Sequence, residues 1–338
     1  MKFVLIATTV NVPSVLAAYR DAAGIDTSFI VAGDLKSPHK DIERFLGKLG
    51  LVHYLHPDDQ KRWACSELLG WNTIARRNIA LLEAIALKPD AIVSIDDDNI
   101  PLDRDFLVDI RRAFERWHAL EAVPADNLYP VFFDPGHPVR QRGVPHGHVS
   151  PAWHRPSLDL KVGVVQGLVL GDPDINAYTR LASNPVAHAV SDTYRAGIVF
   201  RPSYSRWTVF NTQATAFLAE LAPAMFCPPR VGRHDDIVAS LITQFVMRSK
   251  NLFVHFGRPL VWQARNEHDL LKDLHDELWG YEHVPHLAER LDRFDGSEEI
   301  GLRDVWKSFR DLSWFPLLAI DAALAFLDDV DSIAKKAR

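Results

Sequence analysis

A short apolar run that leads directly into three consecutive aspartates is the feature that most limits how this chain can fold. Residues 91–95 read Ala-Ile-Val-Ser-Ile, and Asp96, Asp97 and Asp98 follow without a break. Such a run, without polar alternation, is typical of a strand buried on both faces of a parallel sheet. In sheets of that class, ligands bind outside the carboxyl ends of the strands. The sequence therefore predicts that the three aspartates face a ligand-binding crevice.

The first hundred residues alternate between strand and helix patterns. Short apolar runs typical of strands occupy residues 2–7, 28–32 and 51–54. Helical patterns occupy residues 13–22, 39–49 and 71–87. Later segments continue the mixture, with strand-like runs at 162–170, 199–210 and 252–256 and a helical pattern at 235–247. This alternation predicts an α/β fold, a Rossmann-like and mostly parallel sheet with helices on both faces.

The region from residue 120 to residue 160 breaks this pattern. It is rich in Pro, Gly and His and shows no period of 2 or 3.6, which predicts a loop-rich insertion. Amphipathic helical patterns at 302–309 and 315–334 are expected to pack on the core or on a second copy, as in a homo-oligomer. We therefore predict a catalytic domain over residues 1–285 and a C-terminal helical extension over residues 286–338.

Composition excludes several classes of protein. The chain has 338 residues, with 38 Lys and Arg against 44 Asp and Glu, so its formal net charge is −6. A mildly acidic chain is a poor candidate for nucleic-acid binding, which relies on dense positive charge. Cys65 and Cys227 are the two cysteines and show no zinc or disulfide spacing. No apolar run approaches the length of a membrane span, and we expect a soluble, cytoplasmic protein.

The three aspartates carry the strongest chemical signal. Adjacent carboxylates repel one another, and each is costly to desolvate without a partner. A divalent cation removes that cost, and Mg²⁺ commonly binds one or two carboxylates together with substrate phosphates. The alternative is a solvated acidic turn in which Asp103 caps the next helix. Of the two interpretations, the sequence favours a site for Mg²⁺ or Mn²⁺ at residues 96–98.

A second charged cluster, Gly-Arg-His-Asp-Asp at residues 232–236, stands just before an apolar helix. One of Asp235 and Asp236 is expected to cap that helix, where its charge is favourable. The other is then a candidate general base or acceptor-binding carboxylate. Arg233 could fork onto two phosphate oxygens.

Two more segments hold candidate ligands. Arg76 and Arg77 lie in the first turns of the helix predicted at 71–87, where a cation gains nothing from the helix dipole. An anionic partner such as a diphosphate would explain them, and a solvated helix face is the alternative. Several polar residues converge at 262–269, where His268 is a candidate ligand of a metal or substrate, although a lone histidine is more often structural.

These motifs, in this order, resemble those of the GT-A glycosyltransferase fold and, within it, the reversibly glycosylated polypeptides, which are the plant UDP-arabinopyranose mutases. Ser94–Asn99 is similar to that family's IDDD strand end, and residues 164–177 resemble its HGLWLN-P-DYDA stretch. Residues 223–225 and 232–236 are similar to its GPAM and GRYDD motifs. The resemblance runs from about Phe3 to Tyr281, so the chain looks like a distant relative of this family.

The resemblance implies a GT-A-like fold, a UDP-sugar donor, and Mn²⁺ or Mg²⁺ held by Asp96 and Asp98 through the diphosphate. His268 is the candidate third ligand of the metal. Asp235 and Asp236 are expected on the sugar or acceptor side, as the catalytic residues. The residues expected to bind the nucleotide-sugar are Thr8, Asp34, Arg76, Arg77, Asp96, Asp97 and Arg233.

Two departures from the family pattern bear on the function. The family's FSLREGV stretch holds the arginine that becomes glycosylated, and the matching residues 156–163 contain no arginine. Gln263 stands where the family's WHSKASN stretch has a histidine. The leading hypothesis is therefore a metal-dependent glycosyltransferase that passes a sugar to an unknown acceptor. The alternatives are a UDP-sugar pyranose/furanose mutase and a non-catalytic sugar-nucleotide-binding protein. A nucleotidyltransferase is disfavoured, because residues 8–14 hold no glycine for a phosphate loop.

Overall fold

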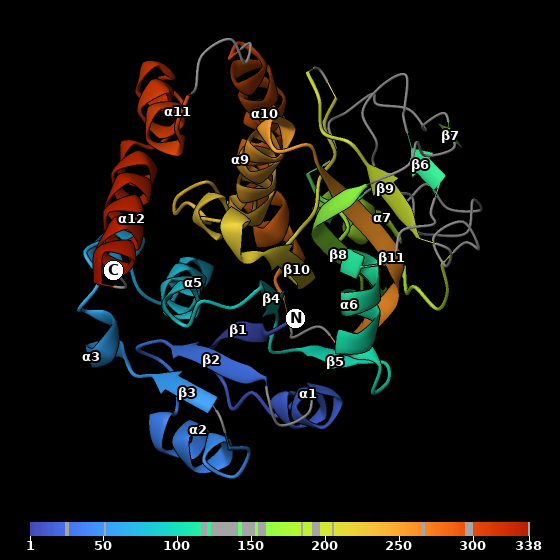
Figure 1. Ribbon diagram of the computed structural model, residues 1–338, viewed down its shortest axis with the longest axis vertical. Coiled ribbons are helices and arrows are strands. Elements are labelled where there is room, and N and C mark those ends of the chain that lie inside the picture. The colour runs from blue at the N-terminus through green and yellow to red at the C-terminus, as the bar shows by residue number, and fades with distance from the viewer. Residues whose placement is uncertain are drawn as a thin grey trace.

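The computed structural model is a mixed α/β structure with one large sheet between two layers of helices (Figure 1). It describes residues 1–23, 27–50, 52–115, 120–122, 141–143, 153–154, 160–183, 185–190, 197–204, 206–264, 268–294 and 300–336. Within these ranges the sheet has eleven strands, ten of them in the order β3-β2-β1-β4-β10-β8-β11-β9-β6-β7, with β5 paired to β11. The predicted α/β fold class is confirmed.

The first half of the sheet is parallel and follows the sequence pattern closely. Its strands are β1 (Phe3–Thr9), β2 (Ser28–Gly33), β3 (Val52–Leu55) and β4 (Ala91–Ile95). The helices that connect them are α1 (Leu16–Ala23), α2 (His39–Leu46), α3 (Pro57–Gln60), α4 (Ser66–Leu69), η1 (Ile74–Arg76) and α5 (Arg77–Ala86). Because all four strands run the same way, β1, β2 and β4 end at the same edge of the sheet, just before Val10, Asp34 and Asp96.

The second half of the sheet is mixed, which corrects the prediction of a mostly parallel sheet. Strand β10 (Ala214–Leu218) runs antiparallel to both β4 and β8 (Lys161–Gly171), whereas β8 runs parallel to β11 (Leu252–Gln263). The other strands are β5 (Asn99–Pro101), β6 (Leu120–Ala122), β7 (Trp153–His154) and β9 (Ile198–Phe200). The strand expected over 199–210 is thus short. Apart from β6, β7, residues 141–143 and Leu160, the predicted insertion at 120–160 lies outside the described residues.

Two hydrophobic cores cover the two faces of the sheet, because successive side chains of a strand point to opposite faces. On β1, Val4 and Ile6 belong to the core that also contains residues of α5 and α9 (Asp235–Ser249). Phe3 and Leu5 pack on the other side, toward α1, α2 and α6 (Phe106–Glu115). Two further short elements are α7 (Ala177–Ser183) and η2 (Ala219–Ala224).

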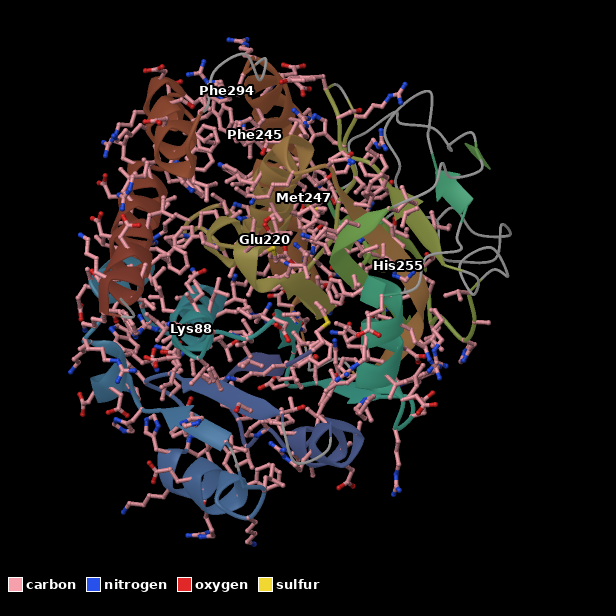
Figure 2. All side chains as sticks on the ribbon, viewed as in Figure 1. Lys88, Glu220, Phe245, Met247, His255 and Phe294 are labelled. Atoms are coloured by element: carbon pink, nitrogen blue, oxygen red, sulfur yellow. The ribbon has the colours of Figure 1, made fainter. Side chains whose placement is uncertain are left out.

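The C-terminal helices belong to the same core as α5 and α9. They are α10 (Leu270–Asp292), α11 (Leu302–Ser308), η3 (Phe309–Asp311) and α12 (Leu317–Lys336). The ring of Phe226 meets those of Trp306 and Phe326, with centroids 5.6 Å and 5.0 Å away. Side chains also fill the space between α9 and α10, where Phe245 and Phe294 meet edge to face (Figure 2).

The boundary predicted at residue 285 falls inside α10, which continues through it to Asp292. Residues 302–336 form the predicted C-terminal helices. Asp329 ties the last of them to the first third of the chain, because its carboxylate accepts the backbone N–H groups of Ala64 and Cys65 at 2.9 Å and 3.0 Å. Among the described residues, no helix combines the length and apolar character that crossing a membrane requires.

Candidate active site

A cavity of about 270 Å³ lies where the acidic turn after β4 meets the start of α9 and the end of β11. Its lining includes Asp96, Asp98, Asp174, Asp235, Asp236, Arg77, Arg142, Arg233, Thr212, Gln213, Gln263 and His268. These residues come from distant parts of the chain. Asp96 and Asp235, predicted from two separate motifs, therefore share one site.

Each aspartate of the acidic turn is held by a different element. Asp96 accepts a hydrogen bond from Arg77, a buried arginine at the start of α5. Asp97 accepts from the hydroxyl of Thr9 at the end of β1, with 2.7 Å between the oxygens. Asp98 accepts from the side-chain amide of Gln263 at the end of β11, at 3.3 Å. Side chains from α5, β1 and β11 thus hold the acidic turn in place without a ligand.

The two outer aspartates of this turn are the ones that reach the cavity. Asp96 and Asp98 line it, and Asp97 does not. Burial raises the pKa of Asp97, while its hydrogen bond from Thr9 opposes that rise. The structure therefore separates the three carboxylates into two that face the cavity and one that fastens the turn to β1.

These two carboxylates fit a divalent cation that also binds a diphosphate. Mg²⁺ needs only one or two carboxylates from the protein when phosphate oxygens and water complete its shell. In the described part of the chain, no group of three or more His, Cys, Asp or Glu side chains is arranged to hold a metal. His268 lines the same cavity, but its Nδ1 lies 3.2 Å from a carboxylate oxygen of Asp273. The structure thus does not group His268 with Asp96 and Asp98.

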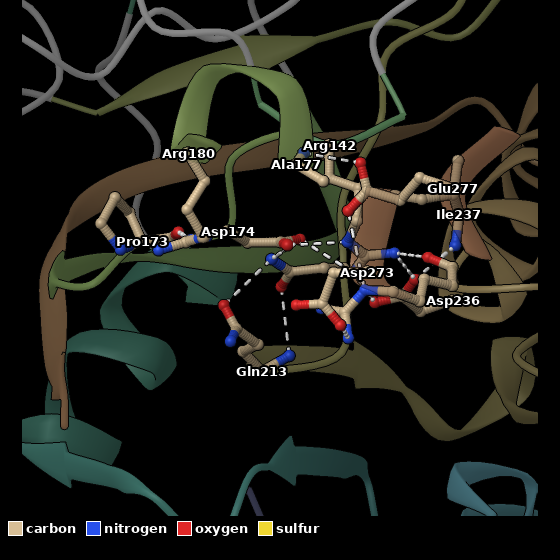
Figure 3. Close-up of polar contacts among 12 residues, drawn as sticks. Arg142, Pro173, Asp174, Ala177, Arg180, Gln213, Asp236, Ile237, Asp273 and Glu277 are labelled. Carbon is tan, nitrogen blue, oxygen red and sulfur yellow. Dashed lines mark hydrogen bonds and ion pairs between the residues drawn. The ribbon is translucent and has the colours of Figure 1, made fainter. Parts of the chain in front are cut away.

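The wall formed by the start of α9 is organised by an arginine that the motifs did not reveal. Arg142 binds the carboxylate of Asp174 through Nε and Nη2, at 2.7 Å and 2.9 Å. It also binds Asp236 through Nη1 and Nη2, at 2.9 Å and 2.8 Å (Figure 3). All three side chains are at least nine-tenths buried, and this pair of bidentate contacts holds the loop after β8 against α9.

Asp235 lies beside the ion pairs of Arg142, but its own environment differs from that of Asp236. Its side chain is buried, and its Oδ2 has no hydrogen-bond partner among the described residues. Burial raises the pKa of Asp235 to about 7, and the neighbouring charge of Asp236 raises it as well. A carboxyl group with a pKa near neutrality is suited to accept and release a proton at physiological pH.

Helix α9 begins at Asp235, so the expectation that Asp235 or Asp236 is its N-cap is wrong. His234 occupies the cap position and makes no side-chain cap bond. Burial lowers the pKa of His234 to about 3, so the imidazole is neutral at physiological pH. Both aspartates instead stand in the first turn, where the helix dipole favours a negative charge.

Arg233 lines the cavity and is only partly exposed. Its Nη1 lies 2.9 Å from Asp273, and its Nε lies 3.6 Å from Glu277, both on α10. The arginine predicted to bind a phosphate therefore already has two acidic neighbours. Arg233 nevertheless lines the cavity.

Four of the predicted nucleotide-sugar contacts lie outside the cavity lining, namely Asp97, described above, and the three that follow. Arg76 is fully buried and donates to Gln60 and Ser66, so it is neither a phosphate contact nor part of a solvated face. Asp34 accepts the backbone N–H groups of Asn72 and Thr73, at 2.7 Å and 3.2 Å. Thr8 is half-buried at the end of β1.

Several residues of the site were missed in the sequence. Arg142, Thr212 and Gln213 stand in no recognisable motif, and Asp174 was noted only as part of a resembling stretch. Arg142 lies 32 positions from Asp174 and 94 from Asp236. Sequence spacing offers no signal for such a contact.

Comparison with known proteins adds little to this geometry. No protein family model matches the sequence, and no curated protein matches it. Among solved structures, the glycosyltransferase TarS of S. aureus is similar over 100% of this chain and 55% of its own, with 12% identity and a TM-score of 0.38. This chain thus spans about half the length of TarS. A TM-score this low does not establish a common fold.

Proposed function

We propose that this protein is a metal-dependent glycosyltransferase that uses a nucleotide-sugar donor, expected to be a UDP-sugar. One observation carries the proposal. A single cavity holds two carboxylates suited to a divalent cation, Asp96 and Asp98, and a third, Asp235, whose pKa burial raises to about 7. Sugar transfer needs both functions at once, a counter-charge for the departing diphosphate and a base for the acceptor.

The cation would be held by Asp96 and Asp98 together with the donor's phosphates. When bound, it would neutralise the negative charge that develops on the diphosphate as it leaves. Arg77 places a positive charge against Asp96, and Gln263 orients Asp98. These contacts fix both carboxylates in place, which reduces the reorganisation needed when a donor binds.

Asp235 would act as the base of an inverting reaction. An acceptor hydroxyl attacks the anomeric carbon of the donor sugar, a new C–O bond forms, and the bond from that carbon to the diphosphate breaks. The nucleoside diphosphate leaves with the electron pair, and the hydroxyl proton passes to the carboxylate of Asp235. With its pKa raised to about 7, this group takes the proton more readily than an ordinary carboxylate does.

A thermal-shift panel tests this proposal. UDP-glucose, UDP-galactose, UDP-N-acetylglucosamine, UDP-arabinose and GDP-mannose are each added with Mn²⁺, with Mg²⁺ or with EDTA. A ligand at 100 times its dissociation constant stabilises the folded state by about 2.7 kcal/mol. For a chain of 338 residues this raises the melting temperature by roughly 4 °C. We expect such a shift with one donor, and only when the metal is present.

Two variants separate binding from chemistry. Asp98→Asn should remove the metal-dependent shift, because one of the two carboxylates at the cavity is lost. Asp235→Asn should keep that shift and lose the release of UDP to an acceptor. Isomerisation of the donor without UDP release would indicate a mutase instead. Donor binding without any turnover would indicate a non-catalytic binding protein, and no shift with any donor would refute the proposal.

A further inference from the structure

We propose that Arg142 is a positioning residue that commits Asp236 to a structural ion pair and so leaves Asp235 as the carboxylate that accepts the acceptor's proton. The inference rests on the proposed function and extends it. The hydrogen bonds of the Arg142 guanidinium distinguish two adjacent aspartates at the start of one helix.

The guanidinium of Arg142 has no donor left for a substrate. An arginine side chain carries five N–H groups. Those of Arg142 are directed at both oxygens of Asp174, at both oxygens of Asp236 and at the backbone carbonyl of Arg233 (Figure 3). Arg142 therefore does not serve as a phosphate ligand, although it lines the cavity.

Asp236 is fully engaged on the other side of this contact. Its Oδ1 accepts from Arg142 and from the backbone N–H of Ile237, at 2.9 Å each, and its Oδ2 accepts from Arg142 at 2.8 Å. Both carboxylate oxygens of Asp236 are thus occupied by the guanidinium of Arg142 and the backbone of α9.

Asp235 differs from Asp236 by the absence of such a partner. Its Oδ2 is buried without a hydrogen bond among the described residues. The charged and titratable groups that act on it are Asp236, Arg142, Arg77 and the thiol of Cys227. Arg77 is bound to Asp96 and Thr212, and burial raises the pKa of Cys227, which stays neutral. Asp235 thus combines a pKa of about 7 with a carboxylate oxygen that no described residue occupies.

The backbone around Arg142 is fixed by the segments that its side chain binds. Gln141 forms an isolated β-bridge with Ile175, and the N–H of Arg142 donates to the carbonyl of Asp174 at 3.2 Å. Gly143 has φ of +84°, and a Cβ there would lie 2.7 Å from the side chain of Ile237. Only glycine combines this conformation with so close an approach to α9. Residues 141–143 therefore form a wedge that presents the guanidinium in one orientation.

The test is a carboxyl titration of the unliganded protein with ¹³Cγ-labelled aspartate, followed by NMR, with Asp235→Asn used to assign the resonance. The charge of Arg142 lowers the pKa of Asp235. Arg142→Gln removes that charge, so the pKa of Asp235 should increase by about 1 to 3 units. Arg142→Lys keeps the charge and should leave that pKa close to the wild-type value. Asp236→Asn removes the like charge and should lower it. The double variant Arg142→Gln/Asp236→Asn should titrate below Arg142→Gln alone.

Activity provides the second readout. In the pH profile of kcat/KM, the acidic limb should move in Arg142→Gln by the same amount as the pKa measured by NMR. A purely structural arginine would lower the rate at every pH without moving that limb, and this result would overturn the proposal. If Arg142→Gln does not fold, Asp236→Asn decides, since an unchanged pKa of Asp235 in that variant also overturns it.

The two readouts separate this inference from the proposed function. The NMR titration needs neither a donor nor an acceptor, so it reports on the electrostatic role of Arg142 even in a protein without transferase activity. Titration as expected, together with no donor binding in the thermal-shift panel, would refute the transferase and support the assignment of Arg142. Donor turnover by the wild type, together with an unchanged pKa of Asp235 in Arg142→Gln, would support the transferase and refute the assignment of Arg142.

Discussion

Replacing Asp235 with asparagine should stabilise the folded protein at alkaline pH while it removes activity. Burial, followed by the charge of Asp236, raises the pKa of Asp235 from 3.8 to about 7. The folded state therefore binds this proton more tightly than the unfolded state does. The resulting stability is complete below about pH 4 and is lost as the pH rises to about 7. Asparagine has no proton to lose, so the variant avoids that loss.

The raised pKa of Asp235 determines how much stability the variant gains. A rise from 3.8 to about 7 corresponds to about 4 kcal/mol in the free energy of unfolding above pH 7. This is an upper value, because nearby dipoles relax around the charge. The entropy of unfolding for 338 residues is about 0.7 kcal/mol per kelvin, so the melting temperature should rise by at most about 6 °C. Of this rise, about 4 °C should develop between pH 5 and pH 8.

Differential scanning calorimetry of the wild type and Asp235→Asn at pH 5 and pH 8 measures this directly. The matched control is Asp236→Asn, which removes a carboxylate from the same helix turn but leaves the buried guanidinium of Arg142 with one partner fewer. That variant should be destabilised at pH 8 by about 3 kcal/mol or more. If the difference in melting temperature between Asp235→Asn and the wild type is the same at both pH values, the reasoning about Asp235 is refuted.

Three further predictions concern other residues. Arg76→Met should lower the free energy of unfolding by about 3 kcal/mol in urea denaturation, because it leaves buried acceptors unpaired. The KM for the donor should not change, and a raised KM would show that Arg76 contacts the donor. Asp98→Asn should abolish the stimulation of turnover by Mn²⁺ in a UDP-release assay, and stimulation at wild-type metal concentrations would exclude Asp98 as a ligand. Asp329→Ala should cost about 3 kcal/mol in urea, because two N–H groups lose a charged acceptor, and an unchanged midpoint would contradict that anchoring role.

The parts of this molecule that sequence could predict are those set by local pattern. Strand β4 was bounded correctly because an apolar run stops at a charged residue, and the start of α9 followed from a helical period. In these cases the physical cause lies within a few residues of the element itself.

The parts that could not be predicted depend on contacts between distant segments. A strand's own residues carry no information about whether its neighbour runs parallel or antiparallel, so the reversal at β10 was hidden. Arg76 and Arg77 are adjacent and read alike, yet one is buried against Gln60 and the other reaches Asp96. Arg142 stands in a region without any period, and its role depends on carboxylates from two other elements.

The aromatic contacts of Phe226 with Trp306 and Phe326 have a consequence for how this protein unfolds. A protease that cut between α10 and α11 would not release a free arm, because the residues beyond the cut fill the same core as α5 and α9. Heat should therefore melt residues 302–336 and the cavity in a single cooperative step. Helix α12, which does not line the cavity, would then help to set the temperature at which the cavity loses its ability to bind a donor.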